Sequence, residues 1–64
     1  MSKAELTVKV CDAIEHLYRA QPGSGSTTER IEHRKLANEI IASLPNKWWR
    51  KVPEEICNQF TALS

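Results

Sequence analysis

The sequence contains neither the long apolar run of a membrane span nor the strong charge of a nucleic-acid-binding tail. No stretch approaches the roughly 20 apolar residues needed to cross a bilayer, so we expect no membrane partner. The formal net charge is only +1, which is too small to predict nucleic-acid binding from bulk electrostatics. The first residues also lack the apolar segment of a secretory signal, and we therefore expect a cytoplasmic protein.

Cysteine and histidine are scarce, with two of each. Cys11 and Cys57 both lie among apolar neighbours in a helical pattern, and a reducing cytoplasm would keep their thiols free. A structural zinc ion needs about four ligands at compact spacing. Cys11 and His16 are on different faces of a helix, and His33 is remote from both in the sequence. We therefore expect no structural disulfide, no metal site and no cofactor.

Residues that could support catalysis are equally few. A nucleophile needs a base within hydrogen-bond reach, and the base needs a third group that orients it. Cys11 and His16 form the one local pair of such groups, and helical geometry separates them. A chain this short also has little room for the pocket of about 300 Å³ or more that ligands occupy. We expect no enzymatic activity and no catalytic residue.

Apolar residues at helical spacing are what the sequence does contain. Residues 3 to 20 are predicted to form one helix, which Ser2 and Glu5 begin with the spacing of a capping box. Pro22 and Gly23 end it. Its core-facing residues are predicted to be Leu6, Val10, Ala13, Ile14 and Leu17.

A loop rich in glycine and serine is predicted over residues 21 to 27, and its composition fits both a natural helix connection and an engineered linker. A phosphate-binding loop would need a longer glycine pattern that closes on Lys-Ser or Lys-Thr. The second helix is predicted over residues 28 to 43, with Ser26 and Glu29 at capping-box spacing. Its buried face is predicted to contain Ile31, Leu36, Ala37, Ile40, Ile41 and Leu44.

Two shorter elements complete the chain. A short helical turn is predicted over residues 46 to 51, and a last helix over residues 53 to 62 that Pro53 begins. Residues 1–64 are therefore predicted to form a single all-α domain, a compact three-helix fold with a short additional turn before the last helix. The core face of that helix is predicted to contain Ile56, Cys57, Phe60 and Leu63.

The core of such a domain is thin. A chain of about 60 residues buries only about 60% of the surface that its unfolded form exposes. Domains of this size usually need a disulfide, a metal or a second subunit, and we expect a homodimer here. Val8, Cys11 and Tyr18 widen the apolar side of the first helix. Such width is typical of a helix that contacts two neighbours, or a neighbour and a dimer partner.

The segment from Lys47 to Lys51 is the strongest indication of a binding surface, because it combines three cations with two indoles. Adjacent residues of a helix point about 100° apart, so both indoles cannot easily enter one core. We predict that Trp48 packs in the core and that Trp49 is partly exposed, or buried against another chain. Tryptophan and arginine are enriched at binding hot spots.

We therefore expect a non-enzymatic protein-interaction module, a regulator or inhibitor of the kind that phages and other mobile elements encode, which docks on a host protein. Its partner-binding residues are predicted to be Lys47, Trp49, Arg50 and Lys51. An apolar helix face together with these residues would insert into a complementary groove of the partner.

The alternative is a DNA-binding transcriptional regulator. Leu36-Ala37 followed by a Trp-containing segment is similar to the first two helices of a helix-turn-helix protein. The sequence departs from that family because Pro45 occupies the turn, the turn glycine is missing, and Pro53 closes the next segment after one turn. A recognition helix needs several turns in the major groove. A second basic patch for this reading would contain Arg30, Arg34 and Lys35.

Overall fold

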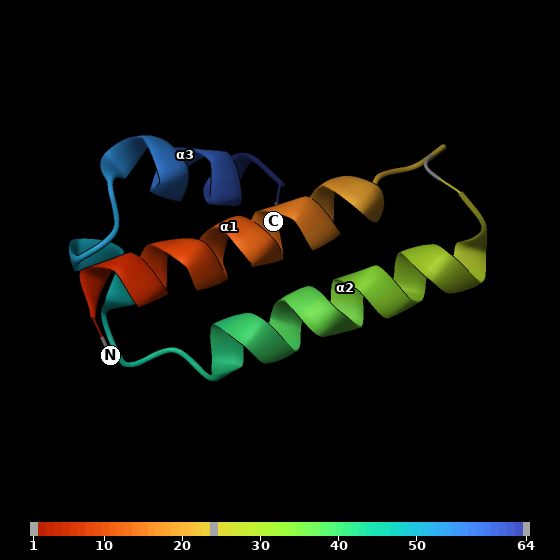
Figure 1. The fold of residues 1–64 in the computed structure, drawn as a ribbon. Coiled ribbons are helices and arrows are strands. Elements are labelled where there is room, and N and C mark those ends of the chain that lie inside the picture. The colour runs from red at the N-terminus through yellow and green to blue at the C-terminus, as the bar shows by residue number, and fades with distance from the viewer. Residues whose placement is uncertain (1, 24, 64) are drawn as a thin grey trace.

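The computed structural model describes residues 2–23 and 25–63 and contains three α-helices and one 3₁₀ turn. The helices are α1 (Lys3–Arg19), α2 (Thr27–Ala42) and α3 (Glu54–Leu63), and the turn η1 (Trp48–Arg50) precedes α3 (Figure 1). The described ranges contain no strand, and the predicted all-α fold is confirmed. One position of the predicted loop, Ser24, lies outside the described residues.

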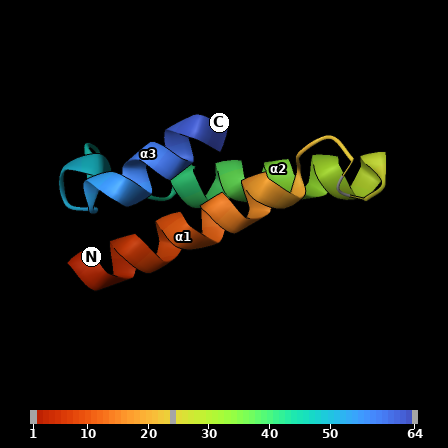
Figure 2. The ribbon, with the colours of Figure 1, turned by 90° about the horizontal axis from the view of Figure 1, so that it is seen from above.

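Helix α1 lies in the middle of the fold. Helix α2 returns antiparallel along one side of α1, and the shorter α3 follows another side in the same direction as α1 (Figure 1). Seen from above, α3 ends well before the loop that joins α1 to α2 (Figure 2). The loop end of the α1–α2 hairpin therefore extends past the third helix. We call residues 20–23 and 25–31, at this end of the hairpin, the arm.

Serine caps begin the two long helices. The Ser2 hydroxyl oxygen accepts a hydrogen bond from the backbone N–H of Glu5 at 3.2 Å. Ser26 accepts from the backbone N–H of Glu29 at the same distance. Each bond satisfies an N–H group that has no partner inside its helix, as the capping-box spacing predicted.

The core consists of two adjoining groups of side chains. The first brings Leu6 and Val10 of α1 against Trp48 and Val52, and half-buried residues of α3 pack on it. The second lies between α1 and α2, where the small side chains of Ala13 and Ala37 pack beside Leu17. Small residues at a helix contact let the two backbones approach closely. None of the described helices is long and apolar enough to cross a membrane.

The prediction for the buried face of α2 was partly wrong. Ile31 is 64% exposed and Leu36 is 41% exposed, whereas Ala37 is buried and Ile40 and Ile41 are half-buried. Leu36 precedes Ala37 by one position, which rotates it about 100° away from α1. Ile31 lies in the arm, where it lines a small groove with Ala20 and Thr27 that includes no residue of α3.

Candidate functional site

The segment between α2 and α3 contains a residue in the left-handed backbone conformation. The backbone of Lys47 has φ 58°, a conformation that is uncommon for residues other than glycine. The chain then turns tightly, with Arg50 N–H donating to the Lys47 carbonyl at 3.1 Å and Lys51 N–H to the Trp48 carbonyl at 3.0 Å. These two backbone hydrogen bonds, each between residues three apart, form the 3₁₀ turn η1.

The two tryptophans of this turn lie in opposite environments. Trp48 is only 9% exposed and meets Phe60 edge to face, with ring centroids 5.5 Å apart. Trp49 is 52% exposed and touches the protein through an edge-to-face contact with Trp48 at 5.9 Å. The structure thus places Trp48 in the core and Trp49 on the surface.

A thiol links the turn to α3. The Cys57 sulfur lies 3.5 Å from the carbonyl oxygen of Trp49 and 3.7 Å from that of Val52, so its proton is donated to one of them at a time. Cys57 is half-buried and Cys11 is exposed, and both are free thiols. The backbone that carries Trp49 is therefore held from both sides, by the buried Trp48 and by α3.

Three cations lie within two residues of Trp49 in the sequence. Lys47, Arg50 and Lys51 are all exposed, and none of them takes part in an ion pair among the described residues. An ion pair of the described residues joins Arg19 to Glu15 on α1 at 3.0 Å. We call the set of Lys47, Trp49, Arg50 and Lys51 the Trp49 turn. It combines an exposed aromatic side chain with three exposed positive charges.

The second predicted basic patch lies on the first half and the middle of α2. Arg30 and Arg34 belong to the first half of that helix and Lys35 begins its second half, whereas the Trp49 turn follows the end of α2 (Figure 1). A helix of 16 residues is about 24 Å long. Arg30 also has a structural role, because its Nε donates to the Ala20 carbonyl at 3.3 Å and satisfies the end of α1. The structure does not join the two patches into one surface.

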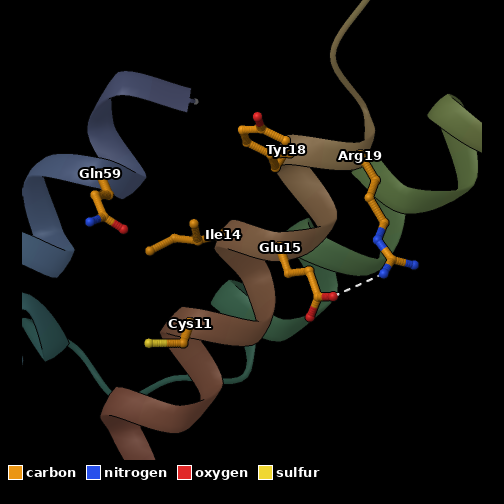
Figure 3. A pocket seen from close by; sticks show the side chains of 6 residues that line it. All are labelled: Cys11, Ile14, Glu15, Tyr18, Arg19 and Gln59. Carbon is orange, nitrogen blue, oxygen red and sulfur yellow. Dashed lines mark hydrogen bonds and ion pairs between the residues drawn. The ribbon is translucent and has the colours of Figure 1, made fainter. Parts of the chain in front are cut away.

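An open groove of about 460 Å³ lies between α1 and α3. Figure 3 shows Ile14 and Cys11 directed toward α3, Tyr18 at the upper rim, and Glu15 turned away to pair with Arg19. A second groove, of about 360 Å³, lies on the α2 side of Phe60 over Leu17 and Ala37. Both are shallow apolar surfaces that helix packing has left uncovered.

The contact between the two histidines was not predicted from the sequence. His16 of α1 and His33 of α2 meet with their Nδ1 atoms 3.0 Å apart. The two residues are far apart in the sequence but close in space, because α1 and α2 fold back as an antiparallel hairpin. The signal that could have predicted this contact is register, since the two histidines lie roughly equidistant from the loop at residues 21–27.

Comparison with known proteins gave no significant match to a family model, a curated protein or a solved structure.

Proposed function

We propose that this chain is a non-enzymatic protein-interaction module that docks on another protein through the Trp49 turn. The observation that carries the proposal is the exposure of Trp49 on a rigid turn whose neighbouring indole is buried. A rigid aromatic residue loses little conformational freedom when it binds, which is why tryptophan is enriched at hot spots. By occupying its target, such a module would act as a regulator or inhibitor.

The chemistry of the turn indicates the kind of partner. The exposed half of the indole needs an apolar recess, and its burial would contribute about 2–3 kcal/mol. The cations Lys47, Arg50 and Lys51 favour carboxylates around that recess. Complementary charge raises the rate of encounter and fixes the orientation of docking. The expected partner surface is therefore an apolar pocket with an acidic rim.

Several features favour a protein partner over DNA. The segment after α2 is a 3₁₀ turn of three residues, too short to lie along a major groove. Helix α3 begins with Glu54 and Glu55 and contains no lysine or arginine, so it would repel phosphates. Arg34 and Lys35 lie in the middle of α2, about two helical turns before its end, and do not adjoin Trp49.

We also propose that the module is a homodimer. Helix α3, all of whose residues are described, has no buried residue, so a single copy holds this helix only by half-buried contacts. On α1, Tyr18 is 67% exposed at the groove of Figure 3, and Val8 is 66% exposed about one turn before Cys11, which lines the same groove. A second copy on this side would cover both residues and the edge of α3.

The test is affinity capture with matched variants. Tagged protein and its Trp49→Ala variant are incubated with nuclease-treated cell lysate, and bound proteins are compared by quantitative mass spectrometry. Ile31→Ala is the control, because Ile31 is also exposed and apolar but lies in the arm. We expect one or a few proteins to be retained by the parent and by Ile31→Ala, and lost with Trp49→Ala.

Charge reversal separates a protein partner from DNA. Arg50→Glu with Lys51→Glu should abolish capture, whereas Arg34→Glu with Lys35→Glu changes the net charge equally in the middle of α2 and should leave capture intact. A DNA-binding protein would instead shift duplex DNA at low salt, with an affinity that falls steeply as salt rises. Such a shift, together with capture that survives Trp49→Ala, would contradict the proposal.

A further inference from the structure

The contact between His16 and His33 joins α1 to α2. The Nδ1 atoms are 3.0 Å apart, while the ring centroids are 5.2 Å apart. Because the nitrogens are much closer than the ring centres, the imidazoles meet edge to edge. In this contact one ring donates its Nδ1 proton and the other accepts with a bare Nδ1.

The surrounding residues hold the two rings in register. Ala13, Leu17 and Ala37 are buried between α1 and α2, and they keep the helices close on one side of the pair. On the loop side, Arg30 binds the Ala20 carbonyl and ties the start of α2 to the end of α1. Both histidines are themselves only half-buried, so one side of the pair is open to water.

We propose that His16 and His33 form a two-histidine clamp for a divalent transition metal ion. Imidazole nitrogen binds zinc, copper and nickel, with a zinc–nitrogen distance of about 2.0–2.1 Å. At that distance, two nitrogens in adjacent positions of a square plane are about 2.9 Å apart, and two in a tetrahedron about 3.4 Å. The observed 3.0 Å lies within this range. A change of ring orientation, without movement of the helices, would direct both nitrogens at one ion.

The ligand set determines which ions the clamp takes. Among the described residues, no group of three or more His, Cys, Asp and Glu side chains could hold a metal. The clamp therefore supplies two nitrogens, and water completes the coordination. Nitrogen donors favour copper(II) over nickel(II) and zinc(II), and they give magnesium and calcium no oxygen ligand. In the metal-bound form each ring keeps its remaining proton on Nε2.

Binding would join the two long helices beside the end of α3. The histidines adjoin the buried group of Ala13, Leu17 and Ala37, on which Leu63 of α3 packs, and the arm extends past this point (Figure 2). An ion bound to both histidines joins α1 to α2 at this point and stabilises the folded state, because the unfolded chain does not hold the two rings together. The clamp is separate from the Trp49 turn, because His33 lies in the first half of α2 and the turn follows the end of that helix.

The test uses the fact that the chain contains only two histidines. Zinc(II) is titrated into the Cys11→Ser, Cys57→Ser protein, in which thiols cannot compete, and the imidazole resonances are followed by NMR. Both rings should shift together and saturate at one equivalent, with nitrogen shifts that identify Nδ1 as the bound atom. The melting temperature should rise with zinc(II) or copper(II), and remain unchanged with magnesium(II).

Substitutions then assign the ligands. His16→Gln and His33→Gln should each weaken zinc binding by about tenfold or more, while Asp12→Asn, one turn from His16 on α1, should leave it unchanged. Binding by only one ring, or equal affinity in either glutamine variant, would overturn the proposal. If a glutamine variant fails to fold, the titration of the parent decides, since independent shifts of the two rings would exclude a clamp.

Discussion

At the scale of single residues, the two tryptophans show how neighbours in sequence take different roles. Trp48 lies against Phe60 in the core, whereas Trp49 faces solvent. This division follows from the geometry of a turn, and it could be predicted because adjacent positions point in different directions. The histidine contact could not be predicted so directly, because it depends on the register between two helices.

The division predicts opposite effects on stability. Trp48→Ala should lower the free energy of unfolding by about 3–5 kcal/mol, because it removes a buried indole and leaves a cavity. Trp49→Ala should lower it by less than about 1 kcal/mol, since much of that side chain is already in water. Urea denaturation followed by circular dichroism measures both. Similar losses in the two variants would mean that Trp49 is a core residue.

At the scale of elements, the helical pattern was informative about α1 and misleading about α2. Leu6, Val10 and Leu17 are buried as the three- and four-residue spacing predicts. In α2, Ile31 and Leu36 are five positions apart, which turns them about 140° from each other, and both remain exposed. The spacing shows that a helix has an apolar side, but how far that side is covered depends on the length of the packed neighbour. Here α3 is too short to cover the arm.

The cap of α2 offers a test at this scale. Ser26→Ala removes the oxygen that accepts the Glu29 N–H bond, and it should lower the free energy of unfolding by about 1 kcal/mol. Ser26→Asp keeps an acceptor and adds a charge that the helix dipole favours, so it should preserve stability. Chemical denaturation of the two variants makes the comparison. Equal stability of Ser26→Ala and the parent would show that the cap contributes nothing.

At the scale of the whole molecule, the short third helix has two consequences. It leaves the arm, where Arg30 donates to the Ala20 carbonyl, without cover from α3, and it leaves an apolar side of α1 in solvent. The length of the chain predicts a small core, because a chain this short buries little surface, and few large side chains of the described residues are buried in the structure. It could not predict where the uncovered surface lies, since that follows from where α3 ends relative to the hairpin.

The proposed dimer gives this uncovered surface a measurable property. Sedimentation equilibrium should give about twice the chain mass, and the melting temperature should rise with protein concentration, as mass action requires. Val8→Glu with Tyr18→Glu places charges on the outward side of α1 and should yield a folded monomer. A parent protein that sediments as a monomer at every concentration would exclude the dimer.

The exposure of Trp49 is central to the proposed function, and its fluorescence tests this directly. In a Trp48→Phe variant, Trp49 is the sole tryptophan. Acrylamide quenching of its fluorescence then measures how accessible the Trp49 indole is to solvent. We predict strong quenching in the free protein, and protection with a blue-shifted emission once the captured partner is added. Unchanged quenching on saturation with the partner would contradict docking through the Trp49 turn.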